Sequence, residues 1–197
     1  RKYGNGIVIY KRRSMFLGYY VGPPVVWAFQ QVPGEIGAQQ HEAIVSIGTD
    51  ENPKHIVMGA TDFYIFDGAK PISIGTNRVK NTVFNALIDS RYYACKALHD
   101  RVNSLVYFFY PVADSPLPDH CVVYNYRTDT WGVDDRPIEV VLDYAAPGVT
   151  YNALGTSYAT YDDLPNLPYD GAFLGSSVRY PAIIDSSHVL KTLTGVS

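Results

Sequence analysis

Residues 56–68, IVMGATDFYIFDG, contain the pattern that decides the fold. An apolar run at 56–58 precedes a short break at 59–62, and a second apolar run from Phe63 to Phe66 ends at Asp67-Gly68. β-Branched and aromatic residues favour strands, and an Asp-Gly pair favours a tight turn because glycine accepts a positive φ without steric cost. This stretch therefore predicts a β-hairpin that is closed by a turn at Gly68.

The same arrangement, two apolar runs on either side of a break, occurs at three further places. The paired runs are 7–10 with 15–20, 105–110 with 122–126, and 182–184 with 189–193. Further β-rich runs flank the two middle hairpins, at 42–47, 71–74, 92–98, 131 and 138–142. Residues 99–104 are expected to form a turn. Each middle unit is therefore expected to contain four successive antiparallel strands.

The inner runs are apolar at nearly every position, which favours sheets that are covered on both faces. Four-stranded sheets stacked face to face on similar sheets describe an all-β fold, the β-propeller. We expect residues 1–197 to form a single propeller region of about two complete and two partial blades, incomplete at both ends and thus a fragment of a larger propeller. Residues 143–178 are expected to form a loop-rich insertion. A two-sheet sandwich is the alternative, and it should show more polar alternation.

One short helix interrupts the predicted strands. In residues 77–87, the apolar residues at 79, 83, 84 and 87 follow a helical period. Thr76 or Asn77 is expected to cap its first turn. The helix should lie between the second and third blades.

The composition narrows the classes of function. The chain of 197 residues is 47% hydrophobic with a net charge of −3, which suits a folded core and argues against a protein that binds nucleic acid tightly. Its longest apolar runs are too short to span a bilayer as a helix. Cys95 and Cys121 lie in apolar runs, so we expect two buried thiols.

Motifs for metal binding are weak. The sequence has no Cys-x-x-Cys, His-x-x-x-His or EF-hand pattern. Each histidine is isolated, and a satisfied or solvated imidazole is the simplest interpretation for His41, His55, His99, His120 and His188. A calcium loop formed by Asp162, Asp163 and Asp170 is conceivable, but a solvated acidic turn explains these residues better. We predict neither a metal site nor a cofactor.

Motifs for catalysis are equally weak. Ser46, Ser73 and Ser186 do not lie in a Gly-x-Ser-x-Gly elbow. Glycosidases require a pair of carboxylates, and Glu139 with Asp143 is the candidate pair in this sequence. A charged side chain turned to solvent explains Glu139 without chemistry. We therefore predict that the protein is not an enzyme.

Several residues are expected to pack the blades or shape their turns: Trp27, Phe63, Phe66, Gly68, Tyr124 and Trp131. In the turn before Trp131, Thr128 and Asp129 are expected to bond to their own backbone, while the indole packs between blades. A tryptophan that stacks on carbohydrate is the alternative. Lys11, Arg12 and Arg13 form the one basic cluster, interpreted as a solvated hairpin turn or as a contact with an acidic neighbour or DNA.

Several short phrases together resemble the β-propeller proteins of bacteriophage tails. The phrases are VGPPVVW at 21–27, IGA at 36–38 with His41, DFYIFDG at 62–68, VYNY at 123–126, DTW at 129–131, YDDLP at 161–165 and YD at 169–170. They are similar to the nozzle or tail-hub ring proteins of short-tailed phages, a family of tail stabilisation or packaged-DNA plug proteins. Members of this family are normally longer and have further blades.

The resemblance implies a structural role in the virion tail after synthesis in the host cytoplasm. Its implied partners are other tail, portal and adaptor proteins, copies of the chain in a hexameric ring, and packaged double-stranded DNA. The ring would retain the DNA and form the channel for its ejection, contacting it weakly and without sequence specificity. No small-molecule substrate is implied. The alternatives are a propeller that binds a glycan, receptor or peptide, and a propeller glycosidase.

Overall fold

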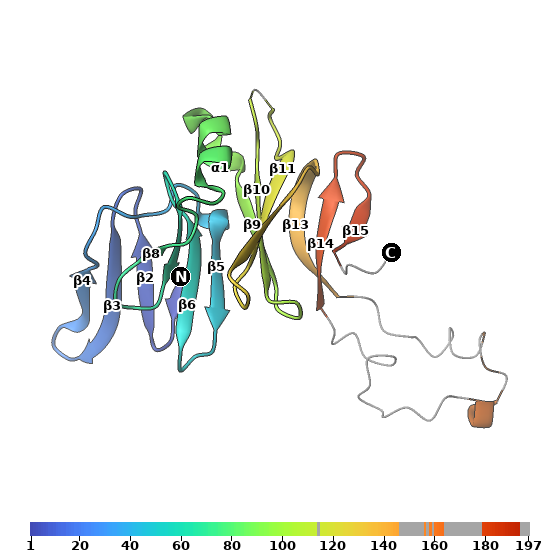
Figure 1. Ribbon diagram of the computed structural model, residues 1–197. Coiled ribbons are helices and arrows are strands. Elements are labelled where there is room, and N and C mark those ends of the chain that lie inside the picture. Colours follow the sequence, from blue (N-terminus) through green and yellow to red (C-terminus); the bar gives the residue numbers. More distant parts are fainter. Residues whose placement is uncertain (114, 146–155, 157, 159, 164–178, 194–197) are drawn as a thin grey trace. The chain divides into compact units, whose positions relative to one another are not determined.

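The computed structural model describes residues 1–113, 115–145, 156, 158, 160–163 and 179–193 (Figure 1). The described chain is mostly β-structure, as predicted, and it divides into two compact units, Arg1–Glu139 and Val140–Ser197. No helix within the described residues is long and apolar enough to cross a membrane.

The described part of the first unit contains three four-stranded antiparallel sheets, whose strands are adjacent in chain order (Figure 1). The first sheet consists of β1 (Lys2–Tyr3), β2 (Gly6–Tyr10), β3 (Met15–Gly22) and β4 (Val26–Gln31). The second consists of β5 (Ile44–Gly48), β6 (Pro53–Met58), β7 (Phe63–Phe66) and β8 (Ile72–Ser73). The third consists of β9 (Lys96–Asp100), β10 (Leu105–Tyr110), β11 (His120–Asn125) and β12 (Thr130–Asp134).

The four predicted hairpins are present, including the one at 56–66, in which Ile56 lies opposite Ile65. Strands β1 and β4 complete the first sheet and have no counterpart in the expected pattern. The turn expected at 99–104 begins later, because β9 continues to Asp100. The buried Asp100 carboxylate then accepts hydrogen bonds from the backbone N–H groups of Val102 and Asn103, which fixes the turn.

The first and second sheets pack face to face. Val8, Met15 and Val32 form a buried cluster with Phe66 of the second sheet. A polar link accompanies this cluster, since Tyr10 Oη lies 2.7 Å from Nδ1 of the fully buried His55. The second sheet is therefore anchored to the first by both apolar and polar contacts.

The opposite face of the second sheet packs against the third sheet. The Phe63 ring lies 4.9 Å from that of Phe108 and 5.0 Å from that of Trp131, measured between ring centroids. Ile56 and Met58 join the same buried cluster as Val106 and Phe108. The second sheet is thus covered on both faces, as the apolar inner runs predict, and the three successive layers exceed the two of a simple sandwich.

The predicted helix is α1 (Lys80–Ala86), which lies between the second and third sheets in the chain (Figure 1). Val79, Val83 and Leu87 are buried in the cluster that these two sheets share, so the helical period is confirmed. The predicted cap is wrong, because Val79 occupies the N-cap position without a side-chain hydrogen bond. The Thr76 hydroxyl instead donates to the Asp62 carboxylate.

The described chain also contains three short 3₁₀ helices: η1 (His41–Ala43), η2 (Asp89–Ala94) and η3 (Tyr161–Asp163). Residues 92–94, expected in a strand, belong to η2, and β9 begins only at Lys96.

A fourth sheet contains β13 (Ile138–Ala145), β14 (Arg179–Asp185) and β15 (Leu190–Thr192), in that order. The sequence predicts that the run at 138–142 flanks the hairpin that became β10 and β11. This prediction is wrong, because the run forms β13 of the fourth sheet. Of the expected insertion at 143–178, residues 146–155, 157, 159 and 164–178 lie outside the described residues.

Candidate functional site

One face of the first sheet packs on the second sheet, and the opposite face is exposed and strongly apolar. Ile9, Tyr20, Trp27 and Phe29 have exposed fractions of 40%, 61%, 37% and 53%. Together with the half-buried Phe16, they form a surface across β2, β3 and β4 that we call the outer face. Soluble proteins rarely expose continuous apolar surfaces of this kind without a partner.

The strand register explains why these side chains share one face. Ile9 lies opposite Phe16, Gly18 opposite Phe29, and Tyr20 opposite Trp27. Because side chains alternate across a strand, residues two positions apart point to the same side. Gly18 leaves room for the Phe29 ring, since a Cβ atom added there would lie 2.7 Å from Phe29 Cε1. The Tyr20 and Trp27 rings meet edge to face at 6.2 Å.

The hairpin tip beside the outer face is also apolar and exposed. Val21, Val25 and Val26 have exposed fractions of 48%, 65% and 44%. This tip corresponds to the phrase VGPPVVW, one of those that resemble the phage-tail family. Trp27, which the sequence predicts to pack between blades, lies on the exposed face of β4, where its ring contacts Tyr20, so its packing role stays a prediction.

Trp131, Tyr124 and Phe63 lie together between the second and third sheets. The Trp131 ring lies 4.6 Å from that of Tyr124 and 5.0 Å from that of Phe63. The indole Nε1 donates a 3.0 Å hydrogen bond to the carbonyl of Ile74. The Trp131 side chain is half-buried, and these contacts occupy it within the protein.

Phe66 and Gly68 lie between the second and first sheets. Phe66 is fully buried, and its ring lies 5.5 Å from that of Tyr3. Gly68 follows β7 with φ +97°, in the turn position that the Asp-Gly pair indicates. A Cβ atom at Gly68 would lie 2.6 Å from Tyr3 Oη, so this position requires glycine for space as well as for its backbone.

The turn before Trp131 is held by a different residue from those expected. The Asn125 side-chain oxygen accepts hydrogen bonds from the backbone N–H groups of Arg127 and Thr128. Asp129 instead accepts hydrogen bonds from the guanidinium of Arg78 and from Tyr124 Oη, and these bonds lower the pKa of its carboxyl. The prediction that the Thr128 and Asp129 side chains bond to the backbone of this turn is therefore wrong.

The basic cluster lies in the turn between β2 and β3. Lys11 Nζ lies 4.7 Å from the centre of the Phe16 ring, and Arg12 Nε donates to Gln39 Oε1 at 2.8 Å. Arg13 is exposed. Two of the three cations thus make contacts within the chain.

The histidines and cysteines have structural surroundings. The carbonyl of Lys2 lies 3.0 Å from His55 Nε2 and can only accept, so Nε2 carries the proton and Nδ1 accepts from the Tyr10 hydroxyl. Burial lowers the pKa of His55 to about 4. Cys95 and Cys121 are free, buried thiols, as expected, and burial raises the pKa of Cys95 to about 12 and that of Cys121 as well.

Two of the remaining candidates for chemistry form local hydrogen bonds. Ser73 Oγ donates to the buried Asp62 carboxylate, and Asp163 accepts from the backbone and hydroxyl of Thr160. Asp170 lies outside the described residues. Ser46 and Ser186 are exposed, as is Asp143, while Glu139 is half-buried. Within the described residues, no three His, Cys, Asp or Glu side chains come close enough together to hold a metal ion.

Sequence reasoning missed the outer face as a surface. Its signal was present in the aromatic residues at alternate positions of 16–29, but β4 was not expected there.

Comparison with protein-family models gives no match, and comparison with curated proteins gives no significant match.

Proposed function

We propose that this protein is a structural segment of a β-propeller that acts by assembly, as a component of the tail nozzle or hub ring of a short-tailed bacteriophage. The observation that carries the structural part of this proposal is the outer face. The assignment to a phage tail rests on the resemblance in sequence described above.

Stacking of similar sheets is the organising contact of the first unit, and it supports the propeller. The second sheet packs against the first sheet through Phe66 and against the third sheet through Phe63. Each contact uses a buried aromatic residue from an inner strand, as packed blades do. The outer face presents the same kinds of side chain on the same kind of sheet. Its occupant is therefore a further four-stranded sheet of the same propeller.

A structural role accounts for the buried carboxylates better than catalysis does. Asp62, Asp100 and Asp185 are almost fully buried, and each accepts hydrogen bonds from groups in its own turn or the next one. A glycosidase requires a carboxylic acid that is free to donate a proton to a substrate. These three carboxylates are instead used to fix turns, which favours a stiff scaffold.

In a tail ring, such a scaffold would repeat around a symmetry axis. Ring closure requires a heterologous interface whose rotation returns to the start. Stiff stacked sheets suit that interface. The proposed role also includes retaining packaged DNA and forming the channel for its ejection, with portal, adaptor and other tail proteins as neighbours and the virion as its location.

The test is electron cryo-microscopy of particles assembled when the protein is expressed with its neighbouring portal and adaptor proteins. We expect a closed ring on the tail axis in which the outer face is buried against another sheet. Phe29→Asp should prevent incorporation, whereas Val133→Asp, at an equally exposed valine on β12, should not. Circular dichroism of both variants checks folding. A monomer that never joins the particle would refute the tail assignment, and a ring with a solvated outer face would refute the blade contact.

A further inference from the structure

A cavity of about 550 Å³ lies where elements of all three sheets of the first unit meet. Its lining comes from β1 and the turn after it, from β5, β6 and the turn between them, from β9 and the residue after it, and from Tyr126. The residues that determine its chemistry are Lys2, Asp50, Lys54, His99, Arg101 and Tyr126. None of them was singled out as a binding residue by the sequence.

The lining has an excess of positive charge. Lys2, Lys54 and Arg101 contribute three cations, and Asp50 is the one acidic residue of the lining. Asp50 Oδ1 lies 2.9 Å from Lys2 Nζ, so its charge is already compensated. Within the described part of the chain, neither Lys54 nor Arg101 forms an ion pair. Leaving the histidines aside, the cavity carries two uncompensated positive charges.

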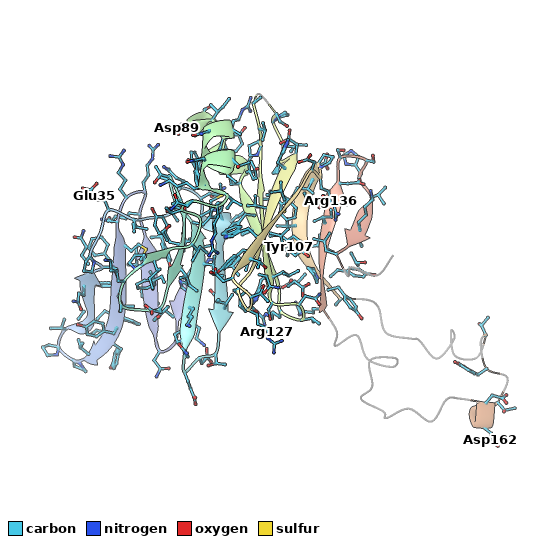
Figure 2. The ribbon with its side chains drawn as sticks, viewed as in Figure 1. Glu35, Asp89, Tyr107, Arg127, Arg136 and Asp162 are labelled. Atoms are coloured by element: carbon cyan, nitrogen blue, oxygen red, sulfur yellow. The ribbon has the colours of Figure 1, made fainter. Side chains whose placement is uncertain are left out.

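These two cations reach the cavity from different sheets. Lys54 belongs to β6 of the second sheet and is half-buried, while Arg101 directly follows β9 of the third sheet. Tyr126, the residue after β11, adds a hydroxyl group 3.2 Å from His99 Nε2. Arg127, the next residue, projects from the same end of the third sheet (Figure 2). A ligand in the cavity would therefore be held from two sheets at once.

We propose that this cavity binds a phosphate group. A guanidinium offers a planar fork of donors that fits phosphate oxygens, and an ammonium adds a compact charge. Two uncompensated cations match the two negative charges of a phosphate monoester, and the hydroxyl of Tyr126 supplies a neutral donor where it accepts from His99 Nε2. The volume exceeds that of one phosphate, so the rest of a nucleotide or a stretch of sugar–phosphate backbone has room beside it.

The phosphate has two sources, a small phosphate compound or the backbone of a nucleic acid. The tail role proposed above does not require this cavity, and the cavity does not require the tail role. A nucleic acid held here would be contacted at one phosphate without sequence specificity. Because roughly two cations would be involved, the logarithm of its affinity should fall with the logarithm of salt concentration with a slope of about −1.8.

The experiment titrates the 197-residue chain with inorganic phosphate and, separately, with a short DNA duplex, by calorimetry and NMR. The variants are Lys54→Gln and Arg101→Gln, singly and together. The control is Arg179→Gln, which removes the same charge from an exposed residue of β14 that does not line the cavity. Lys54→Arg keeps the charge and guards against an effect of altered packing, and denaturation midpoints verify that each variant is folded.

We expect each neutral cavity variant to weaken binding at least about tenfold, as loss of a charge-assisted hydrogen bond does, while Arg179→Gln and Lys54→Arg stay close to the parent protein. Binding of phosphate without the duplex would identify a small phosphate compound as the source, and binding of the duplex, with its salt slope lost in the double variant, would identify nucleic acid. Absence of binding to both probes, or equal weakening by Arg179→Gln, would overturn the proposal. None of these outcomes bears on whether the protein joins a tail ring.

Discussion

His55 makes the stability of the first unit depend on pH. Its imidazole is fully buried between the first and second sheets, and both ring nitrogens are engaged, with Tyr10 and with the carbonyl of Lys2. Protonation would place an N–H at Nδ1, facing a hydroxyl that currently donates to it, and would bury a charge. Burial accordingly lowers the pKa of His55 from 6.5 to about 4.

The direction of the effect follows from proton linkage. The unfolded chain takes up a proton at His55 near pH 6.5, whereas the folded chain resists protonation until about pH 4. Between these values the unfolded state binds more protons, so the free energy of unfolding falls as pH falls through this range. One pKa unit corresponds to about 1.4 kcal/mol. We therefore expect His55 alone to remove about 2 kcal/mol of stability between pH 7 and pH 4.5.

The assay is urea unfolding at several pH values for the parent protein, His55→Gln and the control His41→Gln, which removes an exposed histidine. The pH dependence should be weaker by about 2 kcal/mol in His55→Gln and unchanged in His41→Gln. Subtraction removes the carboxylates, which titrate in every variant. NMR titration of the His55 ring in the parent protein needs no variant. A midpoint near 6.5, or equal slopes for the parent and His55→Gln, would refute the reasoning.

Three further substitutions test the packing and the turns by denaturant unfolding. Trp131→Ala should lower the free energy of unfolding by about 3 kcal/mol, since the half-buried indole loses its contacts with Phe63 and Tyr124. Trp131→Phe should lower it by about 1 kcal/mol through the lost hydrogen bond to Ile74. An unchanged denaturation midpoint in Trp131→Ala would contradict the packing role. Gly68→Ala should lower the free energy of unfolding by more than about 1 kcal/mol, because of the positive φ and the contact with Tyr3. Adding Tyr3→Phe should recover only the part of this loss that is due to the contact. Equal stability of Gly68→Ala and the parent protein would exclude the turn assignment. Asp62→Ala should lower the free energy of unfolding by about 3 kcal/mol, because the backbone N–H of Phe63 and the hydroxyls of Ser73 and Thr76 lose their acceptor. Unchanged stability would show that water replaces the carboxylate.

The parts of the fold that depend on local pattern were predictable. The hairpin at 56–68 combines a dense apolar run with an Asp-Gly turn, and both signals lie within thirteen residues. The helix was recognisable from its apolar period, but its cap was not. Whether Thr76 bonds to the helix or to Asp62 depends on a carboxylate fourteen positions earlier, and only the fold brings it within reach.

Trp27 shows the complementary limit. An aromatic residue in a strand predicts burial, because apolar area favours removal from water. Its exposure depends on which face of which sheet it occupies, and on whether another sheet covers that face. The register of β3 against β4, with its irregularity between Tyr20 and Gly22, sets the face. Residues 21–27 alone show neither the face that Trp27 occupies nor whether another sheet covers that face.

The same argument applies with more force to charge. A net charge of −3 argues against binding of nucleic acid, and the longest run of adjacent cations is Lys11 to Arg13. Both statements are averages along the chain, whereas a ligand experiences the charges arranged around one point. Lys54 and Arg101 are far apart in sequence, but each lies beside the turn that follows the first strand of a four-stranded unit. Stacking of the sheets brings these equivalent turns together, so the search for binding residues in a repeated fold should compare equivalent positions of the repeat rather than adjacent residues.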